Sequence, residues 1–534
     1  MTGSAFNLLA EPLIHISSDD PASLPELLAR LTRDQVESYP ALRPHQAPAW
    51  HMFLVQLAAL ALHRAGTREL PKTVDGWACS LRGLTPEFLE DEPWCLVVDD
   101  QRKPAFMQPP VPTGVELNTP VSTPDALDLL ITSRNHDLKQ AVARQAEAED
   151  WILALVSLQT CEGFGGAKNY GIVRMNGGSS SRSLLGLAPL PQGNSKSSWP
   201  HPGLWFRRDL EVLLATRSEE YQDYAYIGYP ATGGLGLTWL APWPEGEQLP
   251  LKALDLWFIE VCRRVRLSMH SGGITGRRGT SMAPRIAAKE LNGVVGDPWA
   301  PVHKADGKSL TLSGGDFNYS KLVDLLFSGD WKIPLLARPT SFEGGCGTML
   351  LIAQAFSRGN SKTEGFKSRI VPVGGKVSRA LSLGPEREKL HELARKQIDE
   401  IEEFNAALRR ALALAAAGGD AEKRRKEHFA YAKDASTGFD RAADEIFFEH
   451  LWARFEAQEN SSDTHQAEGL CFLKELHTRA KSIFEASLPA IPCARLFRPR
   501  AEARARTFFN GSIRKSFPEL FSAPVPEEPS NVHA

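Results

Sequence analysis

Residues 390–412 read LHELARKQIDEIEEFNAALRRAL, and this stretch decides how the C-terminal part of the chain folds. Its apolar residues recur at mostly three- and four-residue steps with charged residues between them, namely Leu390, Leu393, Ile398, Ile401, Phe404, Leu408 and Leu412. Because an α-helix has about 3.6 residues per turn, this spacing puts the apolar side chains on one face. We therefore predict an amphipathic helix that buries this face against a neighbour.

Three further stretches have the same periodicity, at 446–455, 470–484 and 496–513, after a polar break at 418–426. Four amphipathic segments can bury their apolar faces against one another as a helical bundle. We predict a C-terminal four-helix bundle over residues 379–517. The tail at 518–534 is rich in proline and acidic residues and is predicted to be disordered.

Residues 1–378 have a mixed pattern of short apolar runs and a few helical segments. We predict a helix at 49–65 that is buried on most sides, a second at 146–160 that ends at a glycine cluster, and a third at 347–357. From 205 to 339, glycine, proline and tryptophan residues favour turns and short strands. The predicted fold class is α+β, with a large mixed α/β N-terminal domain before the bundle.

The composition of the 534 residues is that of a folded protein, and the net charge of −3 argues against a surface that is basic throughout. The seven cysteines form no C-x-x-C pair, which indicates reduced thiols and neither a disulfide framework nor a zinc site. Residues 1–11 lack the pattern of a signal peptide, and the apolar stretch 52–62 is too short to span a bilayer. We expect a cytoplasmic protein without a metal or cofactor.

Motifs of enzymes are missing from the sequence, which has no G-x-S-x-G elbow and no H-E-x-x-H pair. We therefore expect a protein that is not an enzyme. The alternative among enzymes is an unusual hydrolase that uses the serines at 179–181 or His136.

Two features favour nucleic-acid binding. Residues 161–171 place four glycines around Lys168, and glycines let a backbone approach a ligand closely, although a tight connector would have the same composition. Basic residues cluster twice, and either cluster is also compatible with an ordinary solvated face. The first cluster comprises Arg263, Arg264, Arg266, Arg277, Arg278, Arg285 and Lys289, and the second comprises Arg495, Arg498, Arg500, Arg504, Arg506, Arg514 and Lys515.

Several short motifs occur in the order in which they occur in the CasA-type large subunit of type I-E CRISPR Cascade, and the chain resembles that family over almost its whole length. The matching segments are FNLLAEP at 6–12, PAFMQ at 104–108, TSRNHD at 132–137, the glycine segment at 163–166 and GNSKTEG at 359–365. The resemblance implies an RNA-guided complex in which this subunit recognises the PAM, the short motif beside the target, and promotes duplex unwinding and R-loop formation.

The resemblance also assigns residues to roles. It implies a glycine loop of Gly163, Gly165, Gly166 and Lys168 at the PAM, with Lys289, or else Arg285, as the lysine that faces the groove. Asn360 and Ser361, perhaps with Lys362, correspond to a wedge that enters the duplex. A guide-RNA loop and a DNA-backbone helix complete the set, with Ser133, Arg134, Asn135 and His136 in the first and Arg495, Arg498, Arg500, Arg504 and Arg506 in the second.

The partners implied by the resemblance are the backbone, handle-binding, small and RNA-processing subunits of Cascade, the crRNA and double-stranded target DNA. Cleavage would come from a helicase-nuclease recruited in trans or from a nuclease domain on another subunit, and no membrane is involved. Two alternatives stay open, a stand-alone nucleic-acid-binding protein and the large subunit of another type I CRISPR complex.

Overall fold

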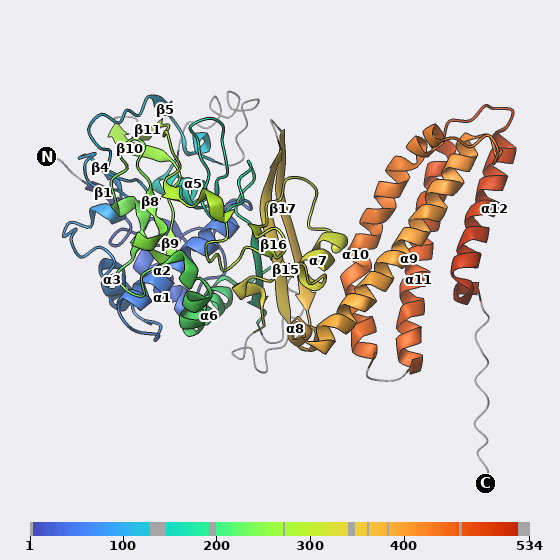
Figure 1. Ribbon diagram of the computed structural model, residues 1–534, viewed down its shortest axis with the longest axis horizontal. Helices are drawn as coiled ribbons and strands as arrows, with labels where there is room; N and C mark the ends of the chain where they lie inside the picture. Colours follow the sequence, from blue (N-terminus) through green and yellow to red (C-terminus); the bar gives the residue numbers. More distant parts are fainter. Residues whose placement is uncertain are drawn as a thin grey trace, which may run out of the picture. The chain divides into compact units, whose positions relative to one another are not determined.

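The computed structural model describes residues 4–128, 146–191, 199–270, 273–339, 348–359, 362–381, 384–458 and 462–521, without the side chains at 358, 359, 362, 363 and 462. Its helices are α1 (Leu24–Thr32), α2 (Ala47–Arg64), α3 (Val74–Arg82), α5 (Ala148–Cys161), α6 (Pro202–Asp223), α7 (Tyr319–Phe327), α8 (Gly375–Ala380), α9 (Pro385–Ala416), α10 (Lys433–Ala457), α11 (Ser462–Ser487) and α12 (Arg498–Ser516). The predicted α+β fold class is confirmed (Figure 1).

The strands are short, with one long exception. They are β1 (Ser4–Asn7), β2 (Ile14–His15), β3 (Pro21–Ala22), β4 (Cys95–Val98), β5 (Thr119–Val121), β6 (Leu184–Pro189), β7 (Leu235–Leu237), β8 (Leu249–Pro250), β9 (Leu254–Ile259), β10 (Arg264–His270), β11 (Gly273–Gly279), β12 (Ile286–Ala287), β13 (Val302–His303), β14 (Lys308–Ser309), β15 (Trp331–Lys332), β16 (Met349–Gly359) and β17 (Lys362–Val373). The exception is the antiparallel hairpin of β16 and β17, to which β6 adds a third strand.

The chain divides into two compact units. The first comprises residues 1–317 and 324–378, and the second comprises 318–323 and 379–534. The segment 318–323 differs from the predicted division, which placed it in the N-terminal domain. The ring of Tyr319 stacks on Phe447 with centroids 4.7 Å apart, and its hydroxyl donates to Asp440 at 2.7 Å. This segment therefore packs with the C-terminal helices.

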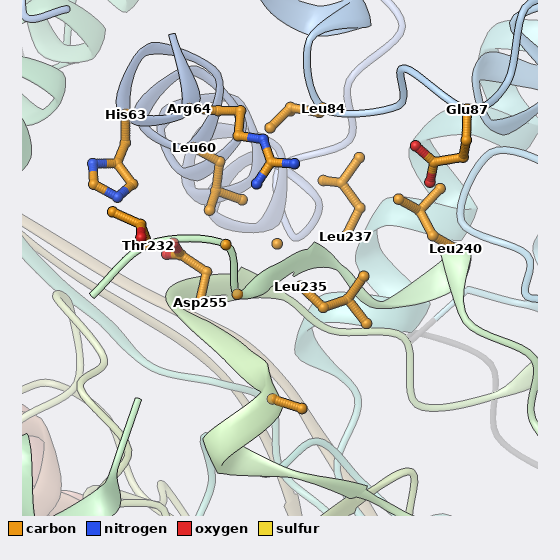
Figure 2. Close-up of a pocket in the computed structure, with 14 residues that line it drawn as sticks. Leu60, His63, Arg64, Leu84, Glu87, Thr232, Leu235, Leu237, Leu240 and Asp255 are labelled. Carbon is orange, nitrogen blue, oxygen red and sulfur yellow. The ribbon is translucent and has the colours of Figure 1, made fainter. Parts of the chain in front are cut away.

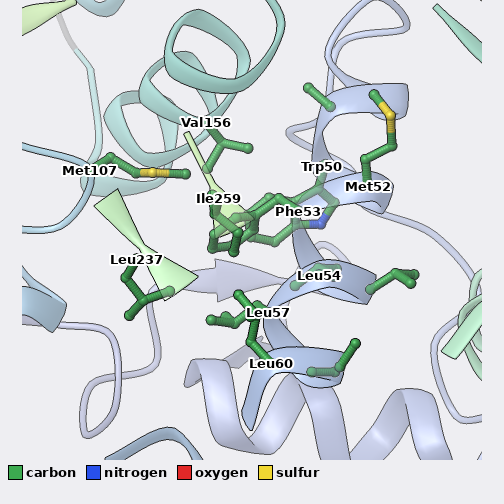
Figure 3. Packing of buried hydrophobic residues seen from close by; sticks show 14 of the residues in the cluster. Trp50, Met52, Phe53, Leu54, Leu57, Leu60, Met107, Val156, Leu237 and Ile259 are labelled. Atoms are coloured by element: carbon green, nitrogen blue, oxygen red, sulfur yellow. The ribbon is translucent and has the colours of Figure 1, made fainter. Parts of the chain in front are cut away.

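The core of the first unit surrounds α2, which is buried on all sides from Pro48 to Leu62. Figure 3 shows Trp50, Phe53 and Leu57 of this helix packed among side chains such as Val156 from α5 and Ile259 from β9. The predictions of a buried helix at 49–65 and of a second helix before the glycine cluster are confirmed by α2 and α5.

Two local predictions in the first unit are wrong. The expected helix at 347–357 is strand β16, which pairs with β17 along its length and with β6 over residues 349–354. A short apolar run suits a buried strand as well as a helix, and partners distant in sequence decide between them. The region after residue 205, expected to hold turns and strands, begins inside the helix α6.

The second unit contains α9 to α12, which run alongside one another (Figure 1). The predicted apolar face of α9 is buried at Leu390, Ile401 and Leu408, which are at most 1% exposed. Ile398 is half-buried, and Gln397 is fully buried in its place with its amide donating to the Phe447 carbonyl at 3.1 Å.

The prediction of disorder from residue 518 is wrong for residues 518–521. Residues Pro518–Phe521 form a 3-10 turn, because the ring of Phe521 packs edge-on against His477 and lies 5.0 Å from the Arg514 guanidinium. Residues 522–534 lie outside the described part of the chain.

Candidate nucleic-acid interface

The glycine loop follows α5 directly and closes on itself. The Gly165 amide donates to the Asn169 carbonyl at 2.9 Å, and the Asn169 amide donates back to Gly166 at 3.0 Å. Gly166 and Lys168 both adopt positive φ, of 110° and 66°. Since few residues other than glycine adopt such angles, the turn holds the exposed Lys168 side chain at its tip.

The base of the loop is fixed by its backbone. The Gly163 carbonyl accepts a hydrogen bond of 2.7 Å from the Arg263 guanidinium, and the Phe164 amide donates to Gly178 at 2.7 Å. A Cβ at position 163 would lie 2.3 Å from the carbonyl oxygen of Ser180. Only glycine therefore fits at this position.

A second segment is tied to the loop. The Ser281 amide donates to the Lys168 carbonyl at 3.1 Å, and the Tyr170 hydroxyl donates to the Met282 carbonyl at 3.2 Å. The chain continues from there to Lys289, which is exposed. The structure thus brings the glycine loop and Lys289, which are more than 100 residues apart, to one region of the first unit.

A cavity of about 610 Å³ lies between these segments. Its lining includes Gly163, Phe164 and Tyr170 of the loop, together with Met282 and Lys289. A volume in this range suits a small ligand or a nucleotide.

Glu260 lines the same cavity and was not predicted from the sequence. It is 4% exposed, and its Oε1 accepts a hydrogen bond of 2.7 Å from the Val173 amide. Its Oε2 has no hydrogen-bond partner among the described residues. Burial raises the pKa of Glu260 to about 7, although the Val173 amide and the charges of Arg174 and Arg182 act in the opposite direction. Its only sequence signal is its position as an acid directly after the apolar run 256–259.

We expect Glu260→Gln to stabilise the protein relative to the wild type at pH 8 but not at pH 5. A carboxyl whose pKa rises on folding binds more protons in the folded state, so wild-type stability falls as the pH rises from about 4.5 to about 7. Glutamine does not ionise, and the relative gain across this window should reach about 2–3 kcal/mol. Urea unfolding at both pH values measures it. A gain that is the same at pH 5 and pH 8 would contradict a raised pKa.

Part of the first basic cluster is buried within the first unit. Arg285, the substitute for the groove-facing lysine, is 3% exposed and donates to the carbonyls of Thr238 and Ala241 at 3.1 and 2.7 Å. Arg266 likewise donates to Val98 at 2.7 Å. Burial lowers the pKa of both guanidinium groups to about 10. Buried guanidinium groups that bind loop carbonyls cannot also contact phosphates.

The second basic cluster is also partly engaged within its own unit. Arg500 donates to the Gly418 carbonyl at 3.0 Å, and Arg504 donates to the Gly419 carbonyl at 2.8 Å. These bonds satisfy backbone carbonyl groups in the turn that follows α9. Both side chains thus have a structural role that their charge pattern did not reveal.

Two more arginines of α12 have local partners. Arg506 binds Glu485 through two nitrogens, with the shorter contact at 2.9 Å, and Arg498 donates to the Ile491 carbonyl at 3.0 Å. Arg495, which precedes the helix, is exposed. Fewer arginines of α12 are therefore available to a binding partner than its sequence suggests.

Several predicted site residues lie outside the described residues. These are Ser133, Arg134, Asn135 and His136 of the predicted guide-RNA loop, and Asn360 and Ser361 of the predicted wedge. The backbone of Lys362 begins β17 and pairs with Gly359.

The serines of the hydrolase alternative have structural partners. The Ser180 hydroxyl donates to the Leu312 carbonyl at 2.7 Å, and the Ser181 hydroxyl accepts from the Phe356 amide at 2.7 Å. Both side chains are buried, so neither is arranged as a nucleophile.

A further cavity of about 580 Å³ lies at the C-terminal end of α2. Figure 2 shows His63 and Arg64 of this helix on one side and Asp255 across from them. Asp255 already pairs with Arg217 at 2.7 Å, and burial together with this arginine lowers the pKa of His63. None of the residues predicted from the sequence lines this cavity.

Within the described ranges, no helix is long and apolar enough to cross a membrane. No group of three or more histidine, cysteine, aspartate or glutamate side chains in the same part of the chain is arranged to hold a metal ion.

Comparison with known proteins identifies the fold. No protein-family profile and no curated protein sequence matches the chain. Among solved structures, Thermobifida fusca Cse1 matches with a TM-score of 0.63 at 14% identity, covering 96% of this chain and 98% of that one. Cse1 from Acidimicrobium ferrooxidans matches at 0.62 and 13%, covering 96% and 99%. CasA (Cse1) from Thermus thermophilus matches at 0.61 and 15%, covering 96% and 100%. The resemblance predicted from the sequence is confirmed at the level of the fold, and the chain has the fold of the Cse1/CasA proteins along nearly its whole length.

Proposed function

We propose that this chain is the large, non-catalytic subunit of a type I-E CRISPR surveillance complex and that it recognises the PAM in double-stranded target DNA. The observation that carries the proposal is the Cse1/CasA fold over 96% of the chain, with an anchored glycine loop that presents Lys168. Its partners are the other Cascade subunits and the crRNA.

The glycine loop suits contact with a minor groove. That groove is about 6 Å wide and presents few distinguishing groups, so a narrow backbone and one long cation reach its floor where bulky side chains do not. Nothing lies within 4 Å of the position that a Cβ of Gly166 would occupy, so this backbone is accessible. Gly163 and Gly165 hold the loop, while Lys168 and Lys289 supply the cations.

Duplex opening is the second proposed step. Strands β16 and β17 pair as far as Gly359 and Lys362, the residues on either side of 360 and 361. We assign the wedge to Asn360, Ser361 and Lys362, as the resemblance implies. Insertion of a side chain costs a few kcal/mol of base unstacking. The guide–target hybrid that then forms is about as stable as the DNA duplex it replaces.

Two further assignments follow the resemblance. The guide RNA is contacted at Ser133, Arg134, Asn135 and His136, and the phosphates of a DNA strand near α12 are contacted chiefly by Arg495. The chain itself does not cleave. A nuclease recruited in trans, or one on another subunit, destroys the target after the R-loop forms.

We expect Lys168→Ala to weaken binding of the assembled complex to PAM-containing duplexes about 5- to 50-fold, because it removes a cation at the tip of an otherwise unchanged turn. Binding to duplexes without a PAM should change little. Gel-shift titration of both duplexes measures the ratio. Lys252→Ala, at another exposed lysine, is the control. Full discrimination by the Lys168→Ala complex would remove the glycine loop from PAM recognition.

The direct test of the proposed function is co-purification. The tagged chain is co-expressed with its genomic neighbours, and any RNA that it retains is sequenced. We expect a multi-subunit particle with uniform, repeat-derived guide RNA. A monomer that binds DNA without guide RNA would instead favour a stand-alone nucleic-acid-binding protein.

A further inference from the structure

The cavity at the C-terminal end of α2 contains a cation that no carboxylate in the described part of the chain neutralises. Arg64 ends this helix, is exposed and lines the cavity, and it forms no ion pair or hydrogen bond with another described residue. Figure 2 shows its side chain extending into the cavity, with Leu84 and Leu237 around the guanidinium group. A guanidinium group presents its N–H donors in a fork that matches a carboxylate. This part of the cavity therefore suits an anionic ligand.

Two other titratable groups of the lining do not compete for Arg64. The Asp255 carboxylate accepts from both terminal nitrogens of Arg217, at 3.1 and 2.7 Å, and from the Trp257 amide at 2.9 Å. Burial and the charge of Arg217 lower the pKa of His63, so this imidazole is neutral at pH 7. The charge of Arg64 is therefore the one that a ligand can pair with.

A second carboxylate limits the charge of the ligand. Glu87 is exposed and lines the same cavity, and Figure 2 shows it beside Leu240, away from Arg64. Its negative charge opposes a ligand with two negative charges, such as a phosphate, more strongly than a ligand with one. The lining therefore favours a single carboxylate close to Arg64.

Much of the remaining wall is apolar. Leucine side chains line the cavity from several elements, namely Leu60, Leu84, Leu235, Leu237 and Leu240. The volume of about 580 Å³ is in the range of cavities that enclose a ligand larger than one side chain. A matching ligand therefore combines one carboxylate with branched apolar groups.

A glycine segment brings backbone to the surface of the cavity. Gly233 has a φ of 77°, and nothing lies within 4 Å of the position that its Cβ would occupy, so this backbone is open to a ligand. The segment continues into β7, whose residues 235–237 line the cavity. Among the described strands β7 pairs with β9 alone, so one of its edges has no strand partner. Extended peptides bind along strand edges, and backbone N–H groups can receive a terminal carboxylate.

We propose that this cavity binds the C-terminal carboxylate of a protein partner whose last residue is apolar. Arg64 pairs with the carboxylate, the last side chain packs among the leucines, and the preceding residues lie along β7. A C-terminal residue carries its carboxylate and its apolar side chain on the same carbon atom, as a cation set among leucines requires, whereas aspartate and glutamate do not. The inference goes beyond the proposed function, because none of the residues assigned to nucleic acid lines this cavity.

The test is calorimetric titration of the full chain with the peptide acetyl-Ala-Thr-Val-Leu, as the free acid and as the C-terminal amide. We expect the acid to bind about tenfold more tightly, because the amide lacks the charge that pairs with the guanidinium group. Arg64→Gln should remove this difference. Arg68→Gln, at an exposed arginine that does not line the cavity, should keep it. Glu87→Gln should tighten binding of the acid about twofold and leave the amide unchanged.

Gly233 offers a second, matched pair of variants. Asparagine and aspartate both tolerate a positive φ, and the position of the new Cβ is open, so both variants should fold. Only aspartate adds a negative charge beside the bound carboxylate. Gly233→Asp should therefore bind the acid about fivefold more weakly than Gly233→Asn does, while the two variants bind the amide equally.

Three results would overturn the proposal. They are no binding of the acid at millimolar concentration, equal affinities for the acid and the amide, and an Arg64→Gln variant that keeps the preference for the acid. Acetyl-leucine that binds as tightly as the peptide would reject a chain terminus in favour of a small carboxylic acid. Inorganic phosphate that competes at the concentration of the peptide would reject a site for a single carboxylate. None of these measurements involves PAM discrimination, so the proposed function and this site fail or stand separately.

Discussion

Replacing Asp297 by alanine is expected to destabilise the first unit by about 3–5 kcal/mol, since it leaves a buried guanidinium without its counter-ion. Arg182 donates to Asp297 through Nε at 2.6 Å and through Nη2 at 2.8 Å, and the two side chains are 1% and 2% exposed. Burial by itself would raise the pKa of Asp297, but the charge of Arg182 outweighs it and lowers the pKa. The pair is therefore ionised at neutral pH.

Among the described residues, Asp297 is the carboxylate that forms an ion pair with Arg182. Arg182 also donates to the neutral Gln56 amide oxygen at 3.0 Å, and the neighbouring Arg174 adds another buried positive charge. An unpaired cation here must be hydrated or must disrupt the core around α2.

Urea unfolding followed by tryptophan fluorescence measures this loss, because Trp452 is the one tryptophan of the sequence that falls in the second unit. The control is the double variant Arg182→Met with Asp297→Ala, which removes both charges and should recover at least about 1 kcal/mol. A single variant that loses less than about 1 kcal/mol would show that solvent reaches this pair.

Replacing Gly163 by alanine is expected to abolish PAM discrimination by the assembled complex, with a stability loss of about 1–3 kcal/mol. The added methyl group would lie 2.3 Å from the Ser180 carbonyl oxygen and 2.6 Å from that of Gly178. Neither backbone can yield easily, because the Ser180 hydroxyl is bound to Leu312 and the Gly178 carbonyl is bound to the Phe164 amide. The loop must move instead, and Lys168 moves with it.

The control for this variant is Gly186→Ala, in the buried strand β6. Nothing lies closer than 3.7 Å to the position of the new Cβ, so this substitution should be nearly neutral. Gel-shift titration with and without a PAM gives the discrimination, and thermal unfolding gives the stability. If a Gly163→Ala complex assembles normally and still discriminates between duplexes with and without a PAM, the position of the glycine loop does not determine PAM recognition.

Long periodic patterns could be read correctly from the sequence. The apolar residues of α9 repeat over more than six turns, so the helical period is clear even where one position departs from it. The buried helix α2 is apolar over most of its length. Short segments could not be read in this way. The run at 349–356 became a strand because β6 and β17 pair with it, and residues 318–323 joined the helical unit through Tyr319.

The sequence by itself determined the fold class, the four C-terminal helices and the glycine loop, since periodicity and conformational freedom are properties of neighbouring residues. Tertiary structure alone decided which charges are available. Arg285 and Arg266 are buried and donate hydrogen bonds to backbone carbonyls, while Lys168 stays exposed. No local sequence pattern distinguishes a buried basic residue from an exposed one. It also decided the state of Glu260, because the pKa and the missing hydrogen bond of a side chain depend on burial by residues from distant parts of the chain.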